Sequence, residues 1–363
     1  MRWSWKLGEI AGIGIYVHAT FLLIIGWVAL QHWRLEHSAA AALAGVVFVL
    51  ALFACVVLHE LGHALAARRY GIRTRDITLL PIGGIARLER VPEEPRGELF
   101  VAIAGPAVNL VIAVALWLWL GLTQGFEPLA GFGVETGQFL RNLLMTNLFL
   151  AGFNLLPAFP MDGGRVLRAL LATRLTYARA TELAAYIGQG IALLFGFVGL
   201  FYNPFLVFIA LFIWIGASSE AGMVQLRAAL GGMPVSRAMM TDFAVLSPTD
   251  PLARAAELTL ASSQRDFPVV DAGRVVGILR QNDLFAGLNR VGHGTLVADF
   301  MCRGFEAVDS HAMLSDVLAR LEGAECRTVP ITHGGSLVGL LSMENLGEFL
   351  RIHGALTQRR PTR

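Results

Sequence analysis

Long uncharged runs of apolar residues dominate the chain up to about Gln225. The runs are Ala11–Trp33, Ser38–Leu58, Leu99–Leu122, Asn142–Met161 and Leu183–Ser219. A helix needs about 20 apolar residues to cross the hydrocarbon core of a bilayer. The last run is long enough for two helices, with Asn203-Pro204 at the turn between them. The pattern predicts six membrane-spanning helices, near residues 15–34, 41–67, 98–121, 138–157, 181–201 and 204–224.

Arginines between these runs indicate how the helices are oriented. One group lies between the second and third expected spans, and a second group lies between the fourth and fifth. The two groups are Arg68, Arg69, Arg73, Arg75, Arg87, Arg90 and Arg96, and Arg165, Arg168, Arg174 and Arg179. Because basic residues concentrate in cytoplasmic loops, we expect these loops, both termini and the C-terminal region to lie in the cytoplasm.

The connection between the second and third spans does not have a helical pattern. Residues Ile77–Ile85 have the pattern of short strands around a break at Gly83-Gly84. Extended backbone at membrane depth is stable only where it is buried in protein or lines a water-filled cavity. The strand around Ile82–Ile85 is therefore expected either to receive an extended peptide or to plug a cavity, and both interpretations stay open.

The C-terminal third is polar and contains a weak internal repeat, with units Pro234–Leu288 and Leu296–Leu350. Each unit has a helix pattern, a short apolar strand around a proline, a turn and a second strand. Two such units normally bury their sheets against each other. The expected fold class is an α-helical polytopic membrane domain with a small membrane-associated β segment, followed by an α/β domain pair.

Composition supports this division. Hydrophobic residues make up 55 % of the chain and charged residues 15 %, against about 25 % charged in soluble domains, which excludes a simple cytosolic enzyme. A net charge of +2 gives no reason to expect a nucleic-acid partner. Three cysteines, Cys55, Cys302 and Cys326, cannot form a disulfide framework, and the last two suggest a reducing compartment for the polar region.

The strongest chemical motif is His59-Glu60-Leu61-Gly62-His63. Histidines at positions i and i+4 share one helical face and can bind one Zn²⁺, and a glutamate beside the metal can take a proton from its water. The motif ends an apolar span, where ionisable residues are costly and usually functional. The alternative is a pair of interfacial histidines without a metal.

A catalytic zinc requires a third protein ligand and an open position for water. Asp162 is the candidate, because it follows a proline-broken span on the same side as His63 and precedes Gly163-Gly164. One alternative is that Asp162 is an exposed turn residue. Another is that Cys55, one turn before His59, is the ligand.

These residues together resemble the site-2 proteases, zinc metalloproteases that cut substrates within the membrane. His59–His63 is similar to the family's zinc helix, and three further segments resemble its other signatures in the expected order. They are Leu80–Gly84, Ala104–Asn109 and Asn154–Gly164. The C-terminal units resemble a pair of CBS domains, which marks the prokaryotic six-span branch of the family.

The resemblance implies that His59, His63 and Asp162 hold one Zn²⁺, that Glu60 activates water, and that Asn154 helps to polarise the scissile carbonyl. It implies a zinc metalloendopeptidase of the prokaryotic cell membrane that acts on membrane-tethered proteins and is regulated by a cytosolic CBS pair. The expected domains are the protease at 1–227, CBS domains at 228–290 and 291–352, and a basic tail at 353–363.

By resemblance to CBS modules, the pair is expected to bind an adenine nucleotide weakly or at one site. The first unit keeps Gly277 and Asp283 but has Arg280 at the usual Ser/Thr position. The second keeps Ser342 but has Asn345 in place of the aspartate. We expect Arg280, Asp283 and Ser342 to serve the nucleotide, with the Asp283 cleft the stronger. The alternative is a ligand-free module for homodimerisation or substrate docking.

Two other functions are considered. A CBS-gated metal or solute transporter would also place ionisable residues in spans, but no internal repeat joins the membrane halves. A non-catalytic scaffold that sequesters membrane proteins would not need the intact Glu60. Zinc content and cleavage of a transmembrane substrate discriminate among the three.

Overall fold

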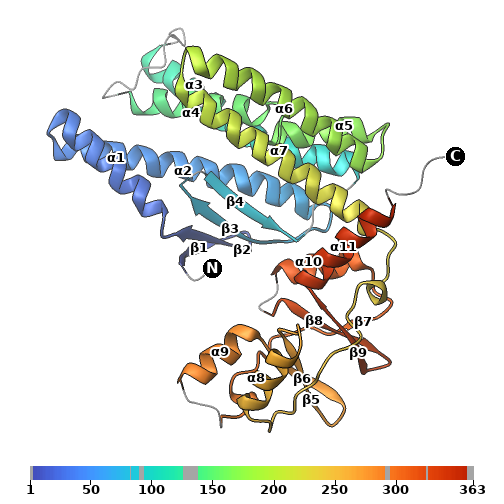
Figure 1. The fold of residues 1–363 in the computed structure, drawn as a ribbon. Coiled ribbons are helices and arrows are strands. Elements are labelled where there is room, and N and C mark those ends of the chain that lie inside the picture. The colour runs from blue at the N-terminus through green and yellow to red at the C-terminus, as the bar shows by residue number, and fades with distance from the viewer. Residues whose placement is uncertain are drawn as a thin grey trace. The chain divides into compact units, whose positions relative to one another are not determined.

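The computed structural model describes residues 3–81, 83–89, 94–125, 138–290, 295–323 and 326–357. The chain divides into two units, Met1–Gln225 and Leu226–Arg363. The first carries most of the apolar helices and one sheet, and the second contains the α/β repeat (Figure 1).

Helices make up most of the first unit. They are α1 (Phe21–Glu36), α2 (Ala39–Arg68), α3 (Pro95–Gln124), α4 (Phe139–Asn154), α5 (Asp162–Ala172), α6 (Tyr177–Phe201) and α7 (Pro204–Leu230), which ends in the second unit. Within the described ranges, α2, α3, α6 and α7 are long and apolar enough to cross a membrane. Helices α1 and α4 have 16 residues each, about 24 Å at 1.5 Å per residue, whereas the hydrocarbon core is about 30 Å thick. In the part of the chain that the structure describes, four helices, rather than the six expected, therefore have the length of a full span.

A four-stranded sheet accompanies these helices. Its strands, in spatial order, are β1 (Ser4–Ile10), β2 (Ile13–His18), β3 (Thr74–Leu80) and β4 (Gly83–Leu88). Strands β2 and β3 run parallel, and the other pairs run antiparallel. Strands β3 and β4 are the ones expected around the glycine pair, while Ile82 lies outside the described residues. Strand β4 is at one edge of the sheet and packs against α2.

The expected first span, 15–34, begins too early in the sequence-based prediction. Residues Ile13, Ile15 and Val17 are buried while their neighbours are partly exposed, which is the period-two alternation of a strand. Pairing with strands on both sides stabilises this extended backbone, so that helix α1 begins only at Phe21. The uncharged run by itself contains no signal for this long-range pairing.

Two glycines place the start of α5 close to the segment that follows α4. A Cβ atom on Gly163 would lie 2.2 Å from the carbonyl oxygen of Leu156, and one on Gly164 would lie 2.6 Å from the backbone nitrogen of Phe159. A larger residue at either position would push α5 away from this segment. The glycines therefore allow Asp162 to occupy the first turn of α5 at its observed position.

A buried ion cluster ties α5 to two other helices. Arg168 is 1 % exposed, its Nε lies 2.8 Å from Oε1 of Glu98 on α3, and its Nη1 lies 2.5 Å from Oε1 of Glu220 on α7. The guanidinium also lies over the rings of Phe159 and Tyr177, 5.0 and 4.8 Å from their centroids. Arg168 is thus a buried structural residue and not simply a charge in a loop.

The second unit contains the repeated helices and strands in the expected order. They are α8 (Leu252–Ala261), β5 (Phe267–Asp271), β6 (Arg274–Leu279) and α9 (Gln281–Arg290), followed by β7 (Val308–Asp309), α10 (Leu314–Gly323), β8 (Thr328–His333), β9 (Ser336–Ser342) and α11 (Met343–Thr357). Two separate sheets result, β5-β6 and β7-β8-β9.

The two repeats are interlocked through their leading segments. A Cβ atom on Gly277 in the first repeat would lie 2.5 Å from the sulfur of Met301, which opens the second. A Cβ atom on Gly339 in the second repeat would lie 2.5 Å from the sulfur of Met239, which opens the first. Each repeat therefore completes the packing of the other, as expected for units that bury their sheets together.

One further sequence-based expectation differs from the structure. Cys302 and Cys326 are joined by a disulfide, whereas we expected reduced thiols; both sulfurs lie in a small cluster beside Ile278. Helix α11 ends at Thr357, within the expected basic tail at 353–363. The remaining tail residues, 358–363, lie outside the described residues.

Candidate metal centre

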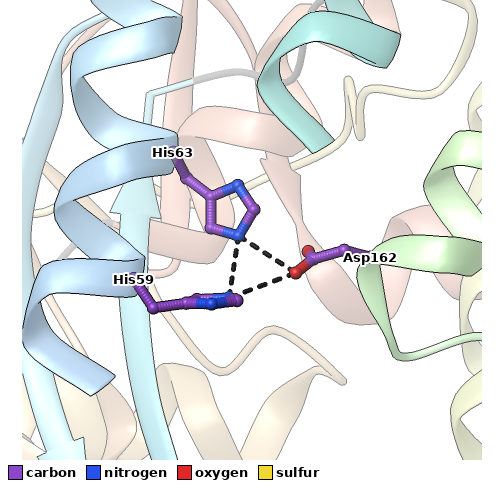
Figure 2. A group of neighbouring side chains, drawn as sticks. All are labelled: His59, His63 and Asp162. Atoms are coloured by element: carbon purple, nitrogen blue, oxygen red, sulfur yellow. Dashed lines mark hydrogen bonds and ion pairs between the residues drawn. The ribbon is translucent and has the colours of Figure 1, made fainter. Parts of the chain in front are cut away.

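Two histidines of α2 point to a common centre (Figure 2). Their Nε2 atoms are 3.1 Å apart, and His59 and His63 are only 7 % and 5 % exposed. Residues four positions apart lie one above the other on a helix, which is why the sequence spacing predicted this pair.

Asp162 completes the cluster from the first turn of α5. Its Oδ2 atom lies 3.2 Å from Nε2 of His59 and 3.1 Å from Nε2 of His63 (Figure 2). Tetrahedral ligands at about 2.0–2.1 Å from a zinc ion would be about 3.3 Å apart. The three donor atoms therefore have the spacing and the chemistry of a zinc site.

The other imidazole nitrogens are hydrogen-bonded to α3. Nδ1 of His63 donates to the carbonyl oxygen of Val101 at 2.7 Å, and Nδ1 of His59 donates to Oδ1 of Asn109 at 2.5 Å. The amide of Asn109 in turn donates to Oδ1 of Asn147 on α4 at 2.8 Å. Protons on both Nδ1 atoms leave both Nε2 atoms free to bind a metal ion.

Asn109 is fully buried, and in the sequence analysis it appears only as the last residue of the segment Ala104–Asn109. Its position within an otherwise apolar span was the available signal, because polar groups at that depth need a specific partner. The sequence alone does not predict that this partner is His59.

Gly105, which has no side chain, leaves the space that the imidazole rings of His59 and His63 occupy. A Cβ atom on Gly105 would lie 2.2 Å from Nε2 of His63 and 2.6 Å from Nε2 of His59. Helices α2 and α3 are also in close contact at Gly62, where a Cβ atom would lie 2.8 Å from the carbonyl oxygen of Ala104. Position 105 can therefore carry no side chain without moving the two imidazoles or the helices.

Glu60 lies beside the edge strand of the sheet. A Cβ atom on Gly84 of β4 would lie 2.8 Å from Cγ of Glu60, so that the strand backbone passes directly over this side chain. Glu60 is partly buried and adjacent in sequence to the first histidine. This arrangement brings an acidic side chain, the three-residue cluster and an edge strand together.

The two remaining candidates for this site are placed differently. Cys55 is buried, and its sulfur accepts a hydrogen bond from Asn147 at 3.5 Å; it is not part of the cluster that Asp162 completes. Asn154 is the last residue of α4 and is partly exposed. It is not among the described side chains that hydrogen-bond to His59, His63 or Asp162.

The nucleotide candidates belong to the second unit. A cavity of about 860 Å³ is lined by residues of both repeats. The lining is Met240, Ser263, Gln264, Arg265, Asp266, Arg280, Gln281, Asn282, Arg327, Thr328, Leu340, Ser342, Met343, Glu344 and Asn345. Arg280 and Ser342 therefore meet at one cavity. Asp283 is not in this lining, and its carboxylate pairs with Nε of Arg280 at 2.5 Å.

Comparisons with known proteins agree with these two units. The model of peptidase family M50 matches residues 47–144 and 134–195, and the CBS domain model matches 235–290 and 297–351. A zinc metalloprotease of Methanocaldococcus jannaschii is 32 % identical over 347 residues, which are 95 % of this chain and 96 % of that protein. A solved structure of the site-2 protease from Methanocaldococcus jannaschii is 38 % identical, covers 60 % of this chain and 95 % of that one, and has a TM-score of 0.45.

The full-length relative confirms the resemblance that the motifs indicated. Its similarity extends over both the helical unit and the repeat, so the combination of the two is a shared property and not a chance pairing of motifs. Four apolar helices make the chain an integral membrane protein. The chain belongs to peptidase family M50, the site-2 protease family of zinc metalloproteases, and carries a pair of CBS domains.

Proposed function

We propose that this metalloprotease cleaves membrane-tethered proteins at bilayer depth, using one Zn²⁺ held by His59, His63 and Asp162. The observation that carries the proposal is the convergence of two imidazole nitrogens and one carboxylate oxygen within 3.2 Å of one another. Three protein ligands leave a fourth position for water. When bound, zinc would lower the pKa of that water to about 7 and polarise the scissile carbonyl.

Glu60 is the proposed general base. Its carboxylate accepts a proton from the water molecule as the water oxygen adds to the carbonyl carbon. The same carboxyl then returns the proton to the amide nitrogen while the C–N bond breaks. Asn154 is the proposed hydrogen-bond donor to the negative charge that develops on the carbonyl oxygen.

Strand β4 is the proposed site for the substrate backbone. A transmembrane helix has all of its backbone amides paired, and must unwind locally before its peptide bond can be attacked. An edge strand offers unpaired N–H and C=O groups to such an extended segment. The contact between Gly84 and Glu60 supports this proposal, because a peptide added to β4 would pass close to the base.

The proposed orientation places the termini, the arginine-rich loops and the CBS pair in the cytoplasm. It rests on the distribution of basic residues. The metal-binding motif lies near one end of α2, and the third ligand follows the C-terminal end of α4. Both positions are close to the proposed cytoplasmic face, where a short aqueous path can supply water.

The test uses Glu60→Gln in full-length protein reconstituted with a model transmembrane substrate. We expect unchanged zinc content and a loss of cleavage of about 10²–10⁴-fold, because the substitution removes the base and leaves the ligands. Glu36→Gln, at the exposed end of α1, is the matched control and should cleave normally. Turnover by Glu60→Gln close to that of the control would exclude the mechanism, and zinc-loaded wild type that cleaves no membrane substrate would favour a transporter or scaffold.

For the second unit, we propose regulation by an adenine nucleotide bound in the cavity between the repeats. Arg280 is the proposed phosphate partner and Ser342 a further polar contact. Asp283, expected to contact the ribose, lies outside the cavity lining and is proposed instead to hold Arg280 in place through their ion pair. The position of Arg280 and Ser342 on one cavity supports this proposal. Calorimetric titration of ATP and AMP into the full chain should give heat that Asp283→Ala weakens. No heat at millimolar nucleotide, or unchanged binding by the variant, would leave the pair as a dimerisation or docking module.

A further inference from the structure

A second group of metal-binding side chains lies at one end of the β7-β8-β9 sheet. Strand β7 ends at Asp309, which pairs with Thr332 on the neighbouring parallel strand. His333 is the last residue of β8, and His311 follows β7 after one intervening residue. The pairing register therefore brings two imidazoles and a carboxylate to one sheet end.

The three side chains converge in space as well as in register. One ligand atom from each lies within 4.8 Å of the others. Oδ1 of Asp309 is 3.0 Å from Nδ1 of His311, and the two imidazole centroids are 5.2 Å apart. The hydroxyl of Ser310 lies 3.1 Å from Nδ1 of His333 and 3.4 Å from Nδ1 of His311. In both histidines, Nδ1 is therefore the ring nitrogen that faces the cluster.

Backbone hydrogen bonds hold this arrangement. The backbone N–H of His311 donates to Oδ1 of Asp309 at 2.9 Å, and the N–H of Ala312 donates to the carbonyl oxygen of Asp309 at 2.9 Å. The N–H of Ser310 donates to the carbonyl oxygen of Thr332 at 2.9 Å. These hydrogen bonds fix the turn and the β8 strand relative to each other, so little ordering is needed when an ion binds.

The first repeat contains different residues at the equivalent positions. Leu246 pairs with Val269 as Val308 pairs with Ile331, and both inner residues pair with the glycine of the next strand. The equivalents of Asp309, His311 and His333 are therefore Ser247, Thr249 and Asp271. The imidazoles are specific to the second repeat, and the first repeat shows that the same turn forms without them.

We propose that Asp309, His311 and His333 form a second divalent transition-metal site, of the zinc class, that bridges the turn after β7 and the β8–β9 hairpin. Imidazole nitrogen with carboxylate oxygen is a donor set for Zn²⁺ and its neighbours in the first transition row. The side chains of His311 and Asp309 are 77 % and 58 % exposed, whereas the cluster on α2 and α5 is buried. The second site therefore exchanges its ion with the solvent, and it gives the CBS pair a metal input separate from the catalytic centre.

The test counts zinc in purified full-length protein at a series of buffered free-zinc concentrations. Four proteins make a complete comparison: wild type, His59→Ala with His63→Ala, His311→Thr with Asp309→Ser, and all four changes together. In His311→Thr with Asp309→Ser, both new residues are those that the first repeat has at the equivalent positions, so the turn of this variant should fold. We expect about two, one, one and zero zinc ions per chain respectively.

A matched control replaces Thr249 and Asp271 of the first repeat by alanine and should keep the wild-type zinc count. Brief treatment of wild type with a chelator should remove only the exposed ion, and leave an enzyme with about one zinc. A single zinc in wild type at every concentration, or an unchanged count after His311→Thr with Asp309→Ser, would overturn the proposal. Neither result would alter the proposed catalytic site, which the His59→Ala with His63→Ala protein tests by itself.

Discussion

Gly105→Ala is the substitution that most directly tests the geometry of the proposed metal centre. The added methyl group would lie 2.2 Å from Nε2 of His63 and 2.6 Å from Nε2 of His59. Ordinary van der Waals contact begins at about 3.4 Å, so at least one imidazole, or the whole of α3, would have to move by about 1.2 Å. Helix α3 has little freedom to retreat, because its backbone is already in close contact with α2 at Gly62.

The displacement is large compared with what a zinc site tolerates. Metal–ligand distances in working sites stay within about 0.2 Å of their preferred values. Loss of a group that only orients a ligand costs about 10–100-fold in metal affinity, and direct displacement of two ligands should cost at least as much. The helix itself should not suffer, because alanine favours a helix interior over glycine by about 0.8–1.0 kcal/mol.

The assay measures zinc affinity by competition with a chelator, cleavage of a transmembrane substrate, and thermal unfolding in detergent. We expect Gly105→Ala to lose zinc and activity while retaining its helical content. The control is Gly190→Ala on α6, where a Cβ atom would meet no atom within 4 Å; it should bind zinc and cleave like wild type. Normal zinc affinity in Gly105→Ala would refute the packing that we describe around the two histidines.

The remaining predictions concern residues around the same centre. Asn109→Ala should weaken zinc binding by about 10–100-fold, measured by chelator competition, because His59 loses the oxygen that orients it. Asp162→Ala should lower zinc occupancy measured by mass spectrometry, whereas Cys55→Ala should not; the reverse result would exchange their roles. Asn154→Ala should keep its zinc and lower the cleavage rate by about 10²–10³-fold, and an unchanged rate would reduce it to a packing residue. Arg168→Met should destabilise the first unit by about 3–5 kcal/mol in a denaturation experiment, because it leaves the buried carboxylate of Glu98 unpaired. Arg168→Lys should recover only part of that loss, and equal stability of Arg168→Met and wild type would contradict this reasoning.

Local patterns were sufficient for much of the architecture. Uncharged runs located the helices to within a few residues at most ends, since the bilayer imposes both a length and a composition on a span. The repeat in the C-terminal third was visible because each unit repeats the same order of helix, strand and turn. The placement of His59 and His63 on one face followed from the helical period alone.

Such local patterns do not predict the pairing of segments that are far apart in the chain. Residues 13–18 are uncharged and continuous with the first helix, and they form a strand only because β1 and β3 lie on either side. The joining of Cys302 to Cys326 and the burial of Arg168 between two glutamates depend on segments far apart in the chain. A short stretch of sequence does not show which distant residues it will contact, so it cannot predict the stabilisation that these contacts provide.

The sequence by itself determined which side chains could perform the chemistry: two histidines and a glutamate on one helical turn, and an aspartate after a broken span. Only the tertiary structure decided that Asp162, and not Cys55, joins the histidines, and that Asn109 orients one of them. It also decided that Gly105 leaves the space they need. The reason is physical: spacing along one helix fixes directions, whereas a metal site requires atoms from several helices to meet within a few tenths of an ångström, and only the packing of those helices sets such distances.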